Sequence, residues 1–136
     1  MTYVTRREHF SAGHRLHNPD WDEERNRAVF GKCNNPTGHG HNYYLEVTVA
    51  GDIDPETGYV VDLKELKEVI LEHVIRKVDH RNLNTDVDFL RGVNPTAENI
   101  AAGIWKQLVD RIPQGRLHQV RLYETEKNIV DYRGDV

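Results

Sequence analysis

Residues 33–49 read CNNPTGHGHNYYLEVTV, and the second half of this stretch contains the pattern that decides the fold. From Asn42 to Val49, apolar and polar side chains alternate, which is typical of a strand with one buried and one exposed face. Such alternation favours an antiparallel sheet that is covered on one side only. We therefore predict a strand over residues 42–49 with its apolar side turned toward the core.

Turn and cap residues mark where the neighbouring elements begin and end. Asp62 and Glu65 are spaced as a capping box, and Pro95 suits the first turn of a second helix. The other predicted elements are a strand from Tyr3 to Leu16, a loop from His17 to Thr37 with one helical turn around Asp22–Ala28, a turn from Gly51 to Gly58, a strand that begins at Tyr59–Val61 and pairs back, a helix from Asp62 to Val78, a helix from Asn94–Asn99 to Pro113, a strand from Leu117 to Glu124 and a closing strand from Ile129 to Tyr132.

Both predicted helices have an apolar stripe at helical spacing, so each can bury one side. We predict a single α+β domain over residues 1–136, with an antiparallel sheet and two helices on one face. The open edges of such a sheet could be closed by an oligomer. The predicted stripes are Leu63, Leu66, Val69, Ile70, Val74, Ile75 and Val78 in the first helix, and Ile100, Ile104, Trp105, Leu108, Val109 and Ile112 in the second.

The composition excludes several classes of protein. A net charge of -4 with acids and bases interspersed leaves no basic footprint for nucleic acid. No apolar run is long enough to cross a membrane, and the N-terminus lacks the apolar core of a signal peptide. A single cysteine cannot form an intrachain disulfide, which fits a reducing compartment. We expect a soluble cytoplasmic protein.

Three histidines are candidate metal ligands. His39 and His41 are two residues apart, so in a strand both imidazoles point to the same face, and Gly40 between them allows a close approach of the backbone. His14, at the end of the first predicted strand, could supply a third imidazole. Three histidines with a vacant fourth position are typical of catalytic zinc, whereas an isolated His-x-His pair is usually a surface feature.

Cys33 lies in a polar loop six residues before His39, and three interpretations of it stay open. It could be a fourth zinc ligand in a closed structural site. It could be a thiolate that acts as base or nucleophile. Free cysteine can also be a small buried hydrophobic residue, although the polar loop argues against this.

Further polar residues are weaker candidates. Asp79 could orient His80, but adjacent side chains on one helix do not face each other, and a histidine at a helix end is common. Glu98 lies in the first turn of the second helix, where a carboxylate is favoured in any case. Glu124 shares a strand face with apolar residues and needs a partner, which a ligand with an amide N–H and an amino group would supply.

Taken together, five ordered motifs along nearly the whole chain resemble the 6-pyruvoyl-tetrahydropterin synthase family, which includes the bacterial 6-carboxy-tetrahydropterin synthases. The motifs are Phe10–Leu16, Phe30–Tyr43, Val78–Asn84, Pro95–Asn99 and Tyr123–Thr125.

The resemblance implies a tunnelling fold, in which trimers close a β-barrel and two trimers stack into a homohexamer with active sites at subunit interfaces. It also implies a lyase that eliminates triphosphate from 7,8-dihydroneopterin triphosphate. The implied site residues are His14, His39 and His41 as zinc ligands, Cys33 as general base, Asp79 and His80 as its activators from a neighbouring subunit, and Thr96, Glu98 and Glu124 as pterin-binding residues, with Glu124 also at the catalytic centre.

The spacing between Cys33 and His39 resembles the 6-pyruvoyl synthases of biopterin biosynthesis rather than the 6-carboxy synthases of queuosine biosynthesis, where it tends to be shorter. Gly13 stands where family members more often have Ala or Ser. We predict the pyruvoyl product, with the carboxy product as the alternative. Arg15 and Lys32 are candidates for neutralising the triphosphate. Two other classes of function remain: a Cys-His-Asp thiol enzyme acting on acyl or amide bonds, and a non-catalytic assembly protein stabilised by zinc.

Overall fold

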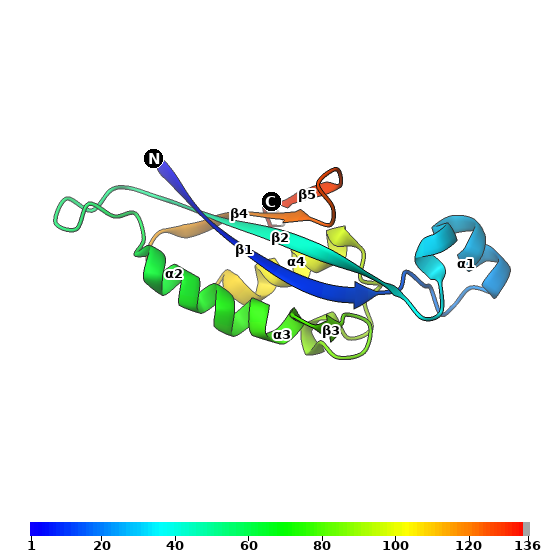
Figure 1. The fold of residues 1–136 in the computed structure, drawn as a ribbon. Coiled ribbons are helices and arrows are strands. Elements are labelled where there is room, and N and C mark those ends of the chain that lie inside the picture. The colour runs from blue at the N-terminus through cyan, green and yellow to red at the C-terminus, as the bar shows by residue number, and fades with distance from the viewer. Residues whose placement is uncertain (135–136) are drawn as a thin grey trace.

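The computed structural model describes residues 1–134 of the chain. Five strands and two long helical segments make up most of it (Figure 1). The elements are β1 (Thr2–His14), α1 (Glu23–Phe30), a 3₁₀ turn η1 (Gly31–Asn34), β2 (His39–Gly51), α2 (Leu63–Ile70), a π-helical turn η2 (Leu71–Ile75), α3 (Arg76–Val78), β3 (Arg81–Asn82), a 3₁₀ turn η3 (Asp88–Leu90), α4 (Ala97–Leu108), β4 (Arg116–Tyr123) and β5 (Ile129–Tyr132).

The sheet has the order β3-β1-β2-β4-β5. β1 and β2 form a long antiparallel pair in continuous register from Thr2 opposite Gly51 to His14 opposite His39. β4 and β5 extend the sheet antiparallel on one side, and the short β3 runs parallel to β1 on the other. The sheet is therefore open, with β3 and β5 as its edges.

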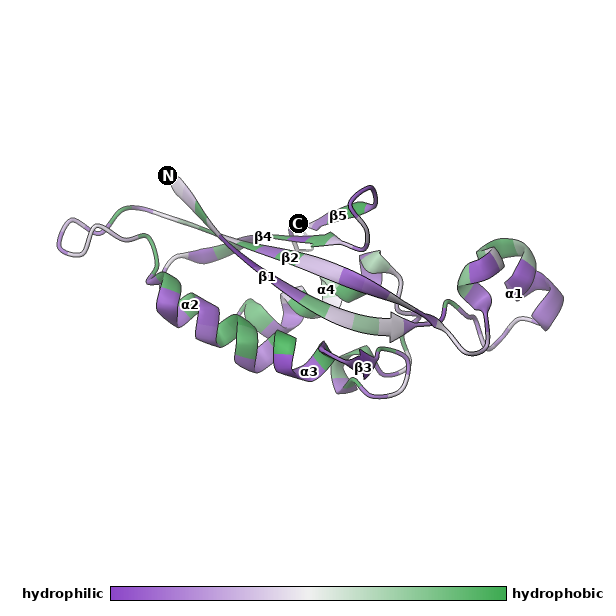
Figure 2. Ribbon diagram, in the orientation of Figure 1, coloured by the Kyte–Doolittle hydropathy of each residue, from purple (hydrophilic) through white to green (hydrophobic). Residues whose placement is uncertain are grey.

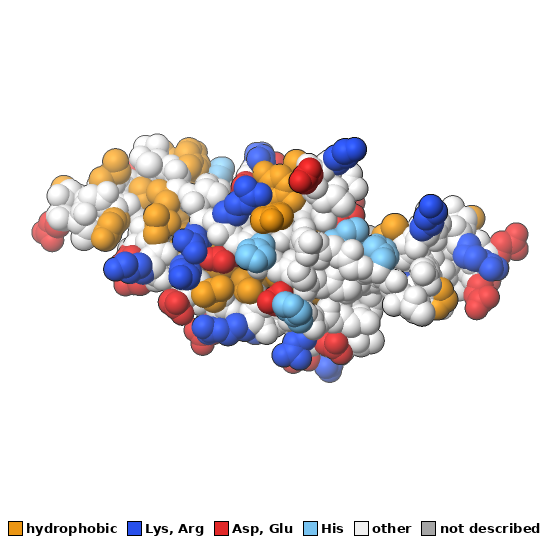
Figure 3. All heavy atoms as spheres, in the orientation of Figure 1, with side chains coloured by type: hydrophobic (Ala, Val, Ile, Leu, Met, Phe, Trp, Pro, Cys, Tyr) orange, Lys and Arg blue, Asp and Glu red, His pale blue; other side chains and the backbone are white. Residues whose placement is uncertain are grey.

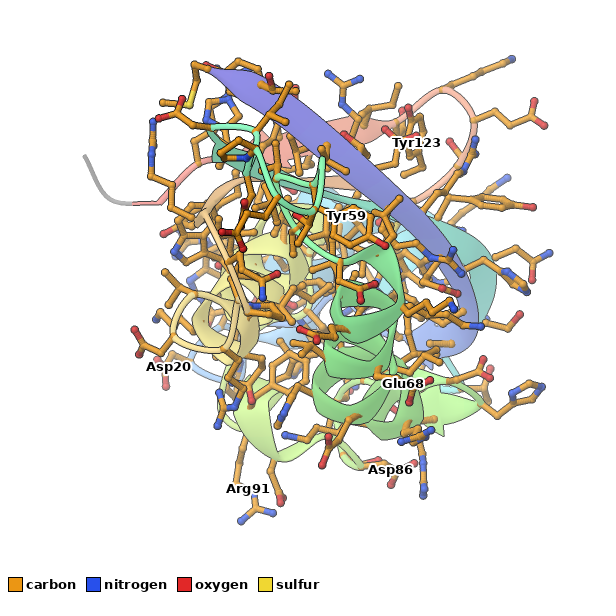
Figure 4. All side chains as sticks on the ribbon, turned by 90° about the vertical axis from the view of Figure 1, so that its left-hand side faces the viewer. Asp20, Tyr59, Glu68, Asp86, Arg91 and Tyr123 are labelled. Carbon is orange, nitrogen blue, oxygen red and sulfur yellow. The ribbon has the colours of Figure 1, made fainter. Side chains whose placement is uncertain are left out.

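The helical segments cover one face of this sheet, and their apolar sides face it (Figures 1 and 2). Phe10, Tyr43 and Leu45 alternate with exposed residues along β1 and β2 and are fully buried beneath the helices. The other face is polar: Tyr123 lies there, away from α2 (Figure 4), and the Arg7 guanidinium lies 4.5 Å from the centre of the Tyr44 ring. The predicted α+β arrangement is confirmed. No helix within residues 1–134 is long and apolar enough to cross a membrane.

The predicted strand at Tyr59–Val61 is wrong. Val60 and Val61 are buried, as their apolar character requires, but they belong to no strand. The preceding segment closes on itself, because the Asp54 N–H donates to the Tyr59 carbonyl and the Gly58 N–H donates to the Asp54 carbonyl. These bonds close a local turn and leave no strand pairing for a returning strand. The two valines therefore enter the core from an irregular segment.

The helical stripes are confirmed in their buried members and wrong at the two ends. Leu66, Ile70 and Val78 are fully buried, and the helical path continues through η2 to the predicted end. Leu63 and Val109, in contrast, are 45% and 40% exposed. Both stand at a helix terminus, where the chain has moved off the sheet.

The predicted loop from His17 to Thr37 contains more structure than one helical turn. Residues 15–38 project as a lobe, hereafter the α1 lobe, beyond the end of β1 and β2 (Figure 1). Asp22 caps α1 by accepting a hydrogen bond from the Arg25 N–H, and only Asn26 is buried within this helix. A helix without an apolar stripe gives no periodic signal, which explains why the sequence indicated a single turn.

Candidate metal centre and active site

The pairing of β1 with β2 brings the three candidate histidines together. His14 lies directly opposite His39, and Ala12 lies opposite His41, so all three imidazoles project from the same face of the sheet. One ring nitrogen from each lies within 4.8 Å of the others. The three side chains predicted as metal ligands could thus bind one ion.

Hydrogen bonds around His14 fix which of its nitrogens is free. Its Nδ1 lies 2.7 Å from the Pro95 carbonyl, and a carbonyl only accepts, so Nδ1 carries the proton. Nε2 then has a lone pair, and it lies 3.1 Å from Nε2 of His39. A backbone carbonyl that orients a histidine through its second nitrogen is usual for metal ligands.

Two of the histidines also have a buried ring nitrogen without a hydrogen-bond partner in the described part of the chain. Nδ1 of His39 and Nε2 of His41 are buried and have no hydrogen-bond partner among residues 1–134. Buried polar atoms without partners are rare because each costs free energy. The donor set of three imidazoles suits zinc or a similar transition metal. The residues therefore fit a metal ion.

Burial favours the neutral form of two of these ligands. It lowers the pKa of His14 and of His41, with the Pro95 hydrogen bond and the carboxylate of Glu124 opposing the shift only in part. Neutral imidazole is the form that binds metal, so these two shifts favour metal binding by His14 and His41. Burial, with a smaller contribution from Glu124, also raises the pKa of the Tyr43 phenol, whose oxygen lies 3.4 Å from Nδ1 of His14.

Cys33 is half-buried in η1 and lines a cavity of about 670 Å³ together with His39 and His41. The group of potential metal ligands within residues 1–134 consists of the three histidines and does not include the Cys33 thiol. The structure thus brings the cysteine to the same cavity as two of the histidines but leaves it outside the ligand cluster. This arrangement favours a chemical role over a closed four-ligand site.

Asn34 ties the cysteine turn to the chain that follows His14. It is 5% exposed, and its amide nitrogen lies 2.9 Å from the Leu16 carbonyl and 3.0 Å from Nδ1 of His17. The Leu16 N–H donates to the carbonyl of Cys33 itself at 2.8 Å. These bonds hold the thiol in a fixed place relative to the histidines. The sequence contains no periodic signal for such a residue, and it was not predicted.

We expect Asn34→Ala to reduce turnover by about 10- to 100-fold without loss of metal, because a displacement of about 1 Å at a reacting group costs that much. Asn26→Ala is the matched control: Asn26 is equally buried and bonds Asn18 and Asp22 in the same lobe, but it does not bond residues 33–34. The measurements are kcat and the rate at which iodoacetamide alkylates Cys33. Equal effects of the two variants on both quantities would show that Asn34 only stabilises the lobe.

Asp79 and His80 form a pair, although they are neighbours in sequence. α3 ends at Val78, Asp79 is extended, and His80 is left-handed with φ 59°, so the helix geometry that would separate the two side chains does not apply. Oδ1 of Asp79 lies 3.1 Å from Nδ1 of His80 and accepts a bond from the Ser11 N–H. That backbone bond, with a smaller contribution from the bond to His80, lowers the pKa of Asp79 against the opposing effect of burial. The carboxylate is therefore charged and can orient the imidazole.

This pair does not share the cavity of Cys33. The His80 side chain is 82% exposed and borders a separate shallow pocket with Gly40, His41 and Asn42. Within residues 1–134 of one chain, His80 and Cys33 therefore line different pockets.

Of the predicted pterin-binding residues, Glu124 lies beside His14, and Thr96 and Glu98 lie at the start of α4. The Glu124 carboxylate follows β4 and lies 3.9 Å from Nε2 of His14. Thr96 caps α4 by accepting a bond from the Asn99 N–H, and Glu98 is exposed in the first turn. The start of α4 is joined to the metal site through the bond from His14 to the Pro95 carbonyl.

The chain is similar to known proteins over nearly its whole length. The sequence model described as 6-pyruvoyl tetrahydropterin synthase matches residues 3–135. The chain is 49% identical to the 6-pyruvoyl tetrahydrobiopterin synthase of Poecilia reticulata, over 98% of this chain and 90% of that protein. It is 48% identical to the Homo sapiens protein of the same name, over 97% of this chain and 91% of that one.

A solved structure of Caenorhabditis elegans 6-pyruvoyl tetrahydropterin synthase has the same fold. The two agree with a TM-score of 0.93 at 41% identity, over 98% of this chain and 96% of that one. This likeness confirms the fold that the resemblance implied. The chain belongs to the 6-pyruvoyl tetrahydropterin synthase family.

Proposed function

We propose that the protein is a zinc-dependent lyase that converts 7,8-dihydroneopterin triphosphate to 6-pyruvoyl-tetrahydropterin and releases triphosphate. The observation that carries this proposal is the shared cavity, in which a cysteine outside the ligand cluster lies beside two histidines of a three-histidine site. The names of relatives 48–49% identical to the chain support the reaction.

His14, His39 and His41 would hold the zinc, which when bound supplies Lewis acidity toward the side-chain hydroxyls of the substrate and leaves room for them. The chain's own contribution here is orientation. The Pro95 carbonyl fixes the His14 tautomer, and the sheet register fixes the two other rings.

We assign Cys33 the role of general base. Its thiolate would remove the proton from the side-chain carbon next to the pterin ring, and the electrons of that C–H bond would pass into the adjacent C=N bond of the ring. Removal of the proton of the middle side-chain carbon would then supply the electrons that break the carbon–oxygen bond to triphosphate on the last carbon. The Asn34 bonds would keep the sulfur at a fixed place during this step.

The Asp79–His80 pair would act on Cys33 of a neighbouring copy. Its exposure and its place outside the Cys33 cavity support a role across an interface. His80, held by the charged Asp79, would exchange a proton with the thiol and so return Cys33 to the state in which it acts.

Glu124, Glu98 and Thr96 would bind the pterin. A carboxylate matches the amide N–H and amino group of a pterin ring in a bidentate way, and Glu124 at the metal site would place the ring with its side chain toward His14. Thr96 and Glu98, at the start of α4, would bind the pterin in the site of their own chain or in the site of a neighbouring copy.

We further propose that the active form is a homohexamer in the cytoplasm. The free edges at β3 and β5 support closure of a barrel by three copies, with two such trimers stacked. The polar outer face of the sheet would then line the barrel.

Mass identification of the product from purified protein and 7,8-dihydroneopterin triphosphate tests the proposed reaction. We expect one equivalent of triphosphate and a product with the mass of 6-pyruvoyl-tetrahydropterin. A 6-carboxy product would show that the protein is instead a 6-carboxy-tetrahydropterin synthase of queuosine biosynthesis. Unchanged substrate in the presence of bound zinc would contradict both.

A further inference from the structure

We propose that Arg15, Arg27 and Lys32 form a polyphosphate-binding wall in the cavity of Cys33, where they hold the triphosphate and stabilise it as it leaves. This inference rests on the proposed function for the identity of the leaving group. All three residues line the cavity of about 670 Å³ that also contains Cys33 and His39. We name them the cationic wall.

Hydrogen bonds orient the guanidinium of Arg15, as expected of a residue that binds an anion. Its Nε donates to the Asn34 carbonyl at 2.9 Å, which fixes the guanidinium plane. Its backbone is fixed on both sides by Asn84, which accepts from the Arg15 N–H at 2.7 Å and donates to the Arg15 carbonyl at 2.8 Å. The two terminal amino groups of Arg15 make no hydrogen bond to any of residues 1–134. An oriented guanidinium with free terminal donors suits bidentate binding of phosphate oxygens.

The charges of the cationic wall are not balanced by the chain. Neither Arg15, Arg27 nor Lys32 forms an ion pair among the residues described, and Glu23 is the only acidic residue that lines the cavity. Arg27 in the last turn of α1 is favoured there by the helix dipole, but that explanation covers neither Lys32 in η1 nor Arg15 after β1. Three cations around one cavity repel each other unless an anion occupies it.

The position of the cationic wall suits the triphosphate leaving group of the substrate rather than its pterin ring. Arg27 and Lys32 are exposed on the α1 lobe, the end of the molecule where Figure 3 shows both blue Lys and Arg and red Asp and Glu side chains, whereas Cys33 and His39 of the same cavity are half-buried. A substrate with its carbon chain at Cys33 would therefore direct its phosphates toward the lobe. Cations placed there would also offset the charge that develops on oxygen as the carbon–oxygen bond breaks.

The test is calorimetric binding of inorganic triphosphate to the zinc-loaded protein and to Arg27→Gln and Lys32→Gln, with zinc content checked after each titration. Arg25→Gln is the matched control, because Arg25 belongs to the same helix but lies over the Trp21 ring at 3.9 Å and does not line the cavity. We expect each wall variant to weaken binding by about ten- to hundred-fold, and the control by no more than about twofold. Binding to the wild type should also weaken as salt is raised.

Absence of binding to the wild type, or equal losses in Arg25→Gln and the wall variants, would overturn the proposal. The outcome is independent of turnover. If triphosphate binds as expected but no pterin product forms, the proposal for the cationic wall is supported and the proposed function is wrong. If product forms while KM is the same in Arg27→Gln, Lys32→Gln and the wild type, the proposed function stands and the wall falls.

Discussion

Cys33→Ala is expected to lower the rate of triphosphate release by about 100- to 10,000-fold, the usual contribution of a positioned base, while the protein keeps its metal. The reason is geometric: the thiol shares a cavity with His39 and His41 but does not belong to the ligand cluster. The measurement is single-turnover release of triphosphate from 7,8-dihydroneopterin triphosphate, with metal content determined on the same sample. Asn26→Ala, in the same lobe, measures how much of any change comes from disturbing the lobe rather than from losing the thiol.

Two results would contradict this role for Cys33. Loss of metal together with activity would make the cysteine a ligand, which would return the site to the closed structural type. Full activity in Cys33→Ala would assign the base to another residue. A covalent adduct at Cys33 in the wild type, seen by intact mass and formed also after chelation, would instead indicate a thiol enzyme acting on an acyl or amide bond.

His39→Ala is expected to weaken metal binding by more than about 100-fold, because even the loss of a residue that only hydrogen-bonds to a metal ligand costs about 10- to 100-fold. His39 is a cleaner choice than His14, which also bonds the Pro95 carbonyl and so supports the start of α4. Nδ1 of His39 has no partner to lose. The measurement is zinc affinity by competition with a chelating dye, and triphosphate release should fall to the level of metal-free wild type.

His73→Ala serves as the control for His39→Ala. His73 is a histidine on the helical segment, paired with Glu72 and outside the cluster, so its removal should change neither zinc affinity nor turnover. Wild-type zinc affinity in His39→Ala would show that the three histidines do not act as one site. Circular dichroism of the metal-free proteins would separate this result from unfolding.

The sequence predicted the parts of the fold that rest on strong periodicity. β2 and the helical stripe through Leu66 and Ile70 follow from alternation and helical spacing, and both patterns are enforced by burial. The two-residue strand β3 has no periodicity to detect, since it pairs only Arg81 and Asn82 with β1. Val60 and Val61 misled the prediction because burial alone does not make a strand.

The candidate site was predictable where it depends on strand geometry and not where it depends on loops. His39 and His41 had to share a face, and His14 pairs opposite His39 in the register of the sheet. Neighbours on one helix are not expected to pair, but Asp79 and His80 lie beyond the end of α3, and the left-handed His80 lets both side chains meet. Asn34 acts through bonds to residues 16 and 17, and such distant partners cannot be read from local sequence.

The central claim is that three imidazoles hold one metal ion and leave a coordination position open, with the cysteine beside it but not bound. X-ray absorption at the zinc edge of the purified protein tests this claim directly. The expected spectrum shows three nitrogen ligands at about 2.0 Å and a further oxygen, without sulfur. A sulfur shell at about 2.3 Å, or fewer than three histidine nitrogens, would contradict it.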